Sequence, residues 1–422
     1  MNKNIKLAVA GAVLALSASA ANAGIVIPAG EWTLDVNGNV NAYANYTRAD
    51  RTTGTATSGV FVAGGHAYEG QNNSSGVRQG VTPTRTTGIN TGLLPSWIGF
   101  TGKTRQNDLD VEFTISMQPS VSENSYHGDG SNGTASGGGA VNATFLNRQT
   151  YLSFGDKSWG SIKLGKDLGV FASDAILNDM TLLGVGAGAG NSGAAVNTTL
   201  GGIGTGYLYA AWKGQIAYTT PNFNGFQATV ALTNPNMGYV AGTVNQDRLG
   251  FEGKASYSFS ADNFSGKVWV SGASYDVNVA ANTSVSTTIS AGDIGATINA
   301  NGFGLTGYYY TGSGAGRTAL GIDGFTSAGV KRDSDGGYVQ ATYILPTKTK
   351  LGAAYGISNL DGLAADLSTN LVKENERITV GLYHPLTKHL NIVAEYNNVD
   401  SKAQNGNKAE SQTYSAGAIL FF

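Results

Sequence analysis

Residues that could carry out acid–base or metal chemistry are few in this chain of 422 residues. It has no cysteine, which removes disulfides, thiol catalysis and thiolate metal sites together. Two of its four histidines, His384 and His389, flank a predicted turn, which favours turn or interfacial residues over metal ligands. No Ser, His and Asp residues have a spacing that suggests a catalytic triad. We therefore expect neither an enzyme nor a bound cofactor.

A phosphate-binding loop and a nucleic-acid-binding surface are also disfavoured. The glycine cluster from Gly184 to Gly190 lacks the lysine and the strand–helix context of a phosphate-binding loop. The net charge of −2 gives no general attraction to nucleic acid. The cluster is better interpreted as a flexible loop, and we expect no nucleic-acid partner.

Charged and apolar residues alternate along the chain, as they do on the two faces of a β-strand. In residues 108–117 the apolar positions are 109, 111, 113, 115 and 117, and between them lie Asp108, Asp110 and Glu112. Soluble sandwich strands also alternate, but they are about five or six residues long. The segments here are nearer ten or eleven, the length that a tilted membrane-spanning strand needs. The pattern predicts a transmembrane antiparallel β-barrel, apolar outside and polar inside.

Sixteen such strands are predicted, an even number as expected when both termini lie on the same side. Tight turns such as 102–107 and 345–349 alternate with long polar connections, including 47–93, 119–146, 278–287, 312–335 and 358–375. The stretch 128–140 reads as the tip of an external loop. The predicted strands begin near Trp32, Pro95, Asp108, Asn147, Trp159, Ala211, Phe226, Arg248, Gly266, Thr288, Phe303, Gly336, Thr349, Glu376, His389 and Gln412.

Both ends of the chain fit an exported membrane protein. Residues 1–23 have a basic start, an apolar core and a small-residue cleavage site, so we expect a signal peptide cut between Ala23 and Gly24. No later stretch is long enough for a transmembrane helix. The last segment has one continuous apolar face that ends in Phe422. This ending resembles the assembly signal of bacterial outer-membrane barrels, and it predicts a terminal strand that pairs with the first.

Several motifs resemble the trimeric general porins of Gram-negative outer membranes. The segment Ile98-Gly99-Phe100-Thr101-Gly102 matches the second strand of that family, and residues 148–152 and 160–166 match its fourth and fifth strands. Residues 218–226 resemble a later hairpin. The motifs cover about a third of the chain, in the order and spacing of the family.

The resemblance implies one barrel domain over residues 24–422, with sixteen strands, assembled as a homotrimer in the outer membrane. It also implies a third external loop, about residues 167–209, that folds inward and narrows the channel. Partners would be outer-membrane lipids, the barrel assembly machinery and small hydrophilic solutes. The loop contains Asp174 and Asp179, and the pair Asp179-Met180 resembles the family's constriction loop.

The chain departs from the family at the expected constriction. The usual acidic residue at the loop tip is missing, and the basic positions of the opposite wall fall on Asn39, Trp97, Lys166 and Thr219, of which only Lys166 is basic. Because side chains alternate between the two faces of a strand, Trp97 is expected on the lumen side. Arg148 shares parity with two outward apolar residues, which argues against the lumen and leaves a subunit contact or a bulge as alternatives.

These residues predict a pore in which the electric field across a narrow opening sets the preference for ions and polar solutes. Asp174 and Asp179 are expected to face Lys163, Lys166 and Lys213 across the narrow part. The expected function is passive diffusion of small hydrophilic solutes and ions. The alternatives are a substrate-specific porin, for example for sugars, and a barrel that serves structure or adhesion through its long loops.

Overall fold

The computed structural model describes residues 24–49, 84–119, 121, 146–188, 198–235, 244–245, 247–279 and 285–422. The predicted signal peptide and the predicted loop tip at 128–140 lie outside these residues. Within the described ranges, no helix is long and apolar enough to cross a membrane.

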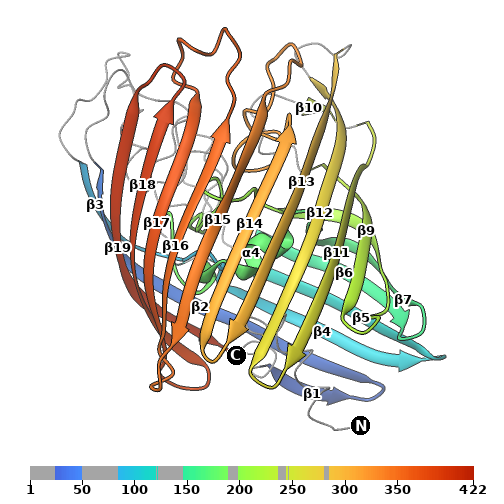
Figure 1. Ribbon diagram of the computed structural model, residues 1–422. Coiled ribbons are helices and arrows are strands. Elements are labelled where there is room, and N and C mark those ends of the chain that lie inside the picture. The colour runs from blue at the N-terminus through green and yellow to red at the C-terminus, as the bar shows by residue number, and fades with distance from the viewer. Residues whose placement is uncertain are drawn as a thin grey trace, which may run out of the picture.

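Nineteen strands in the described residues form one antiparallel sheet (Figure 1). Two short helices, α4 (Ser173–Asn178) and η2 (Met180–Leu183), lie between the seventh and eighth strands. The strands are β1 (Ile25–Ala29), β2 (Trp32–Ala49), β3 (Thr84–Asn90), β4 (Trp97–Gln106), β5 (Leu109–Gln118), β6 (Leu146–Asp156), β7 (Gly160–Leu168), β8 (Trp212–Thr219), β9 (Phe226–Thr233), β10 (Val244–Asn245), β11 (Gly250–Ala261), β12 (Phe264–Val279), β13 (Ser286–Ala300), β14 (Phe303–Ser313), β15 (Asp333–Ile344), β16 (Lys350–Leu360), β17 (Val372–Pro385), β18 (Leu390–Ala403) and β19 (Lys408–Phe421).

The sheet closes on itself through its first and last long strands. β19 pairs with β2 from Ser411↔Ala49 to Phe421↔Asn39. Beyond β19, Phe422 exchanges two backbone hydrogen bonds with Gly38. Closure leaves no unpaired edge, which is what a sheet surrounded by lipid requires. The predicted pairing of the terminal strand with the first is therefore confirmed.

Sixteen strands build the barrel wall, and three short ones extend it. β3 and β4 pair with successive parts of β2, and β10 and β11 pair with successive parts of β12. β1 adds a hairpin to the start of β2. The predicted all-β, sixteen-stranded antiparallel barrel is confirmed, and the three short strands were not predicted.

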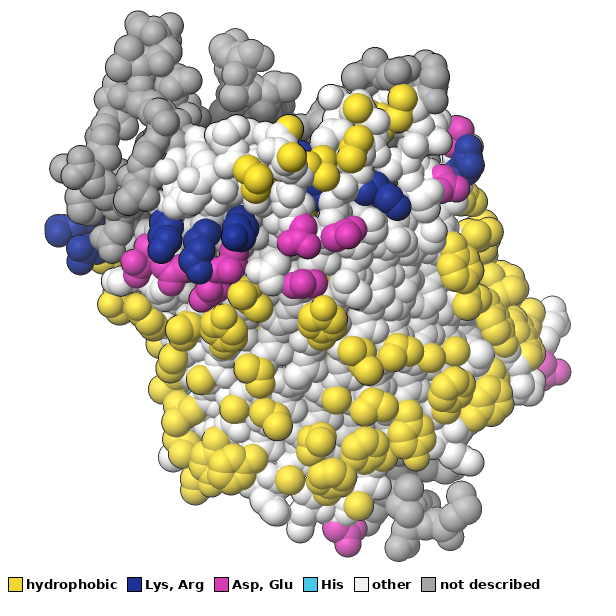
Figure 2. All heavy atoms as spheres, turned by 45° about the horizontal axis from the view of Figure 1, so that its top comes forward, with side chains coloured by type: hydrophobic (Ala, Val, Ile, Leu, Met, Phe, Trp, Pro, Cys, Tyr) yellow, Lys and Arg dark blue, Asp and Glu magenta, His cyan; other side chains and the backbone are white. Residues whose placement is uncertain are grey.

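Side chains alternate between an apolar outer face and a largely polar inner face. On β12, Val268 and Val270 are about half exposed, whereas Lys267, Trp269 and Ser271 are buried. Figure 2 shows apolar side chains spread over the outer wall, with basic and acidic side chains gathered above them. An apolar belt facing outward fits a hydrocarbon environment.

The two ends of the barrel differ in their connections (Figure 1). At one end the turns are tight, and Asn107 and Asp108 of the β4–β5 turn both have positive φ. At the other end the connections are longer, as predicted. Some of them are shorter than expected, because β12 runs to Val279 and β13 begins at Ser286, within the predicted loop 278–287.

Candidate functional site

The segment between β7 and β8 contacts strands that are distant in sequence. The Tyr338 hydroxyl on β15 donates to the Ala175 carbonyl at 2.9 Å. The Gln340 amide, also on β15, accepts from the Met180 N–H at 2.6 Å and donates to the Asn178 carbonyl at 3.1 Å. Figure 1 shows α4 behind β13 and β14. Strand side chains therefore satisfy the free backbone groups at the ends of these short helices.

Local sequence explains the break between α4 and η2. Asp179 is in an extended conformation, and its carboxylate accepts from the Thr181 N–H at 2.9 Å. This is the N-cap arrangement that aspartate favours. The cap also fixes the position of the Asp179 side chain in the barrel.

Two buried carboxylates on the wall anchor the two parts of this segment. Glu252 on β11 accepts from the backbone N–H groups of residues 170–171 at 2.6 and 2.9 Å. Glu395 on β18 accepts from those of residues 185–186 at 2.9 and 2.8 Å. Each carboxyl group thus accepts two backbone N–H groups that would otherwise be buried without a partner, which fixes the segment to the wall at two points.

The two anchors differ in charge compensation. Glu252 pairs with Lys213 at 2.7 Å, and both side chains are almost fully buried. It also accepts from the Tyr275 hydroxyl. Glu395 accepts from the Tyr383 hydroxyl at 2.7 Å and has no ion pair among the described residues. Sequence reasoning missed both glutamates, because their partners lie about 80 and 210 residues away along the chain.

Glycines allow the segment to approach the wall closely. A Cβ at Gly184 would lie 1.9 Å from an oxygen of Glu395, and a Cβ at Gly356 on β16 would lie 2.1 Å from the Thr205 carbonyl oxygen. Neither distance leaves room for a side chain. The glycine-rich composition of the segment therefore has a packing reason.

Asp174 on α4 lies between two lysines of the wall. Its carboxylate pairs with Lys254 on β11 at 2.9 Å and with Lys267 on β12. Burial favours the protonated acid, but the two lysines outweigh burial and hold the pKa of Asp174 below its ordinary value. The carboxylate is thus ionised, and the group of three carries one excess positive charge.

Asp179 contacts a different set of residues. It accepts from the Tyr207 hydroxyl at 2.7 Å, and one of its oxygens lies 3.8 Å from the Arg377 guanidinium on β17. All three side chains are buried. The segment therefore links its own two halves through Tyr207 and Asp179.

The lysines predicted to face these acids lie elsewhere. Lys163 pairs with Asp167 on its own strand, and Lys213 pairs with Glu252. Lys166 shares the face of Leu164 and binds the Asn147 carbonyl at 2.8 Å. That face is the outer one, because the partners of Leu164, Leu152 and Ile216, are about half exposed. The predicted position across the lumen from Asp174 and Asp179 is therefore wrong for Lys166, which is on the outer face. For Lys163 and Lys213, which face inward and bind other acids, it stays a prediction.

The three predicted neutral positions all face inward. Trp97 packs edge-on against the buried Phe421, with ring centroids 6.4 Å apart. Asn39 is fully buried and donates to the Pro95 carbonyl at 2.8 Å. Thr219 shares a hydroxyl–hydroxyl hydrogen bond of 3.0 Å with Thr229. Asn39 thus holds the chain before β4, and a role in lining the pore stays a prediction for all three.

Arg148 faces inward, contrary to its parity. The β5–β6 pairing has a register shift between Ser116 and Met117, which leaves Arg148 as the extra residue of a bulge. A bulge redirects the side chain that it carries. The guanidinium lies between two indole rings, 4.4 Å from the centroid of Trp97 and 4.3 Å from that of Trp212. Of the two alternatives left open by the sequence, the bulge is the one observed.

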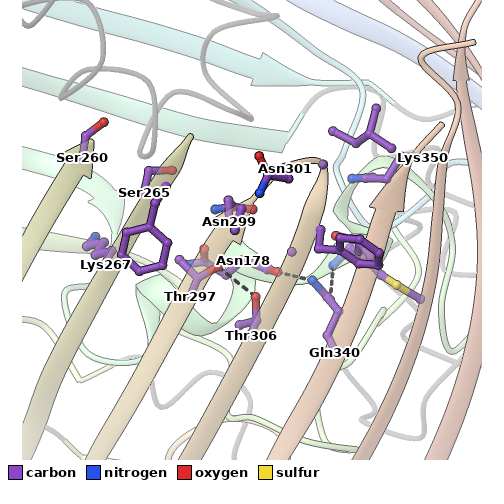
Figure 3. Close-up of a pocket in the computed structure, with 18 of the residues that line it drawn as sticks. Asn178, Ser260, Ser265, Lys267, Thr297, Asn299, Asn301, Thr306, Gln340 and Lys350 are labelled. Atoms are coloured by element: carbon purple, nitrogen blue, oxygen red, sulfur yellow. Dashed lines mark hydrogen bonds between the residues drawn. The ribbon is translucent and has the colours of Figure 1, made fainter. Parts of the chain in front are cut away.

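A cavity of about 580 Å³ lies beside α4 and η2 (Figure 3). Asp174 and Asp179 border it, whereas the three predicted lysines do not. Lys267 and Lys350 are its cations, and Lys350 lies over the Tyr383 ring at 4.8 Å. Among the described residues no carboxylate forms an ion pair with Lys350. The polar neutral side chains that line the cavity include Asn178, Ser260, Ser265, Thr297, Asn299, Asn301, Thr306, Gln340 and Thr342.

This arrangement suits passage and orientation of solutes more than chemistry. Hydroxyl and amide groups replace water around a polar solute, and fixed charges bias ions. Within the described ranges, no three His, Asp or Glu side chains gather as a metal site requires.

Comparison with known proteins places the chain in a family. The Gram-negative porin family matches residues 9–404. The fold is similar to the outer membrane channel DcaP of Acinetobacter baumannii, with 15% identity, a TM-score of 0.63, and coverage of 95% of this chain and 100% of that one. It is also similar to the anion-selective porin from Comamonas acidovorans, with 15% identity, a TM-score of 0.58, and coverage of 93% and 100%.

A further similar structure is OmpT of Vibrio cholerae in its trimer form, with 14% identity, a TM-score of 0.50, and coverage of 93% and 99%. No curated protein matches the chain. At these identities the solved structures establish the fold alone, and the family match carries the assignment.

The barrel and its polar interior define an outer-membrane channel for passive diffusion. The chain belongs to the Gram-negative porin family. Its predicted location in the outer membrane follows from that membership. Porins are channels, so the membership gives no support to an enzymatic function.

Proposed function

We propose that the segment between β7 and β8 narrows this channel, and that small hydrophilic solutes and ions diffuse past it without a dedicated substrate. The observation that carries the proposal is the anchoring of the segment by inner-face side chains from β11, β12, β15 and β18. A segment held at so many points reduces the free cross-section permanently and does not act as a gate that swings open.

A second candidate function is a substrate-specific channel, for example for sugars. The cavity beside α4 favours it, because neutral amides and hydroxyls line most of that cavity. Liposome swelling with sugars of graded size separates the two functions. Entry that falls smoothly with size and does not saturate supports general diffusion. Saturation by one solute supports the specific channel, and no entry of any solute would refute both.

Selectivity should depend on the charges that border the cavity. Asp179→Asn removes a negative charge next to Arg377 and should shift permeability toward anions, whereas Lys350→Gln should shift it toward cations. A change of about 0.4 kcal/mol in the energy of a monovalent ion alters permeability about twofold. The measurement is the reversal potential in a salt gradient.

Lys166→Gln is the matched control, because it removes a charge from the outer face. It should leave the reversal potential unchanged. If Lys166→Gln shifts selectivity while Asp179→Asn and Lys350→Gln do not, the proposed position of the constriction is wrong.

We also propose a homotrimer with three independent channels. OmpT of Vibrio cholerae, which shares the fold, has a trimer form, and Ala42, Ala44, Ala416 and Ala418 lie on the outer face where β2 and β19 meet. Small side chains let two barrel walls approach closely. Unheated protein should migrate as a trimer and boiled protein as a monomer on a gel. A species that stays monomeric on chemical cross-linking would count against the trimer.

A further inference from the structure

The first part of the connection between β14 and β15, residues 314–324, is buried, although it is rich in glycine and polar residues. The described residues 314–322 have almost no exposed surface: Arg317 is 4% exposed, Leu320 5% and Ile322 6%. An external loop that projected into water would leave such side chains exposed. This connection must therefore pack against the rest of the protein.

The surface against which it packs is the inner face of the barrel. Ala315 and Leu320 share a hydrophobic cluster with Tyr275 and Val277 of β12 and Ile289 of β13. These wall residues are buried and have the opposite parity from the exposed Val268 and Val270. The connection therefore lies inside the mouth of the barrel.

There it touches the segment between β7 and β8. The Tyr209 N–H donates to the Thr318 carbonyl at 2.7 Å, and Tyr209 forms an isolated bridge with Ala319. Leu208 and Tyr207 belong to the same hydrophobic cluster as Leu320. Two connections far apart in sequence thus form one continuous packed layer.

Arginine–aspartate pairs hold the connection in place. Arg317 pairs with Asp323 within it at 2.5 Å. Arg332, at its end, binds Asp366 of the β16–β17 connection through two hydrogen bonds of 2.7 and 2.8 Å, and donates to the Asp323 carbonyl at 2.9 Å. The bidentate geometry fixes orientation as well as distance. These pairs therefore fix the connection in its position inside the mouth.

We propose that residues 314–324 are a second size-restricting segment of the channel, on the external side of the first. The inference rests on the proposed function, in which the β7–β8 segment narrows the lumen. Because residues 314–324 fill the mouth beside β12 and β13, a solute must pass both segments. The size limit for hydrophilic solutes is then set jointly, and bulky solutes are excluded at the mouth.

Residues 315–323 can be deleted without stretching the chain that remains. Gly324 approaches Gly314 so closely that a Cβ on Gly324 would lie 2.0 Å from the Gly314 carbonyl oxygen. Removing residues 315–323 and joining the two glycines should therefore leave β14 and β15 undisturbed. We expect single-channel conductance to rise about 1.5-fold or more, and larger sugars to enter liposomes, because the free cross-section increases.

A point variant gives the same test without a deletion. Leu320→Asp places a charge in the apolar cluster, so residues 314–324 should detach from the inner wall. Conductance should then rise as it does after the deletion. Leu367→Asp is the matched control in the β16–β17 connection, where Leu367 is 60% exposed, and it should change nothing. Retained heat-modifiable migration on gels shows that each barrel is intact.

The packing itself is tested by cross-linking, because the chain has no native cysteine. Tyr209→Cys with Ala319→Cys should form a disulfide without changing conductance. Intact barrels that conduct like the wild type after excision and after Leu320→Asp would overturn the second segment and leave the proposed function standing. A wild-type protein that admits no solute would overturn both.

Discussion

Glu252→Ala is expected to destabilise the folded barrel strongly. The substitution leaves Lys213 as a buried charge without its partner and removes the acceptor for two backbone N–H groups of the segment. Loss of one partner from a buried pair costs about 3–5 kcal/mol. The free energy of unfolding in denaturant, followed through gel mobility or tryptophan fluorescence, measures the effect.

A more exposed ion pair, between β4 and β5, provides the control. Lys103 and Glu112 are 3.5 Å apart, and the Lys103 side chain is 58% exposed. Lys103→Ala should have a much smaller effect, because Glu112 stays in contact with water and keeps its hydrogen bond from the Tyr151 hydroxyl. Equal destabilisation by the two alanine variants would show that Glu252 is not a special anchor. Glu252→Ala protein that does fold should also conduct more, since residues 170–171 are released.

Phe422→Ala is expected to lower the amount of protein in the outer membrane severely. The backbone of Phe422 makes its two hydrogen bonds to Gly38 whatever the side chain is. Its partly buried ring can contribute at most roughly 1.5–3 kcal/mol of apolar burial. We therefore expect the finished barrel to be nearly as stable, and the defect to lie in recognition by the barrel assembly machinery. Membrane fractionation measures the first quantity and unfolding of refolded protein the second.

The neighbouring residue should show the reverse pattern. Phe421 is 1% exposed and packs against Trp97. Phe421→Ala keeps the terminal aromatic residue but removes a buried ring, which costs about 3–5 kcal/mol. A Phe422→Ala protein that reaches the outer membrane at the wild-type level would show that the end of the chain is not the assembly signal.

The period-two pattern of the sequence determined the barrel. All sixteen predicted strands are present; the largest differences are at β17 and β19, which begin at Val372 and Lys408 rather than near Glu376 and Gln412. Both strands extend further at the loop end because their polar residues continue the ladder after the apolar pattern stops. Alternation is a local property, so one sequence suffices to read it.

The charge pairs of the interior were decided by the tertiary structure. A bulge changes the face of the strand on which the following side chains lie. For Arg148 that bulge arises only from the pairing of β6 with β5. Asp174 meets Lys254 and Lys267, about 80 and 93 residues away, because the segment packs against β11 and β12. No local sequence pattern indicates which strands of the barrel the segment packs against.

The sequence by itself determined the closed sheet, its apolar exterior and the family, because each depends on residues a few positions apart or on a motif. Only the tertiary structure decided what lies inside. Residues 314–324 of the β14–β15 connection have the polar, glycine-rich composition of an exposed loop, yet they are buried through contacts with β12, β13 and Tyr209. Burial of this kind is the sum of long-range contacts, which chain composition does not record.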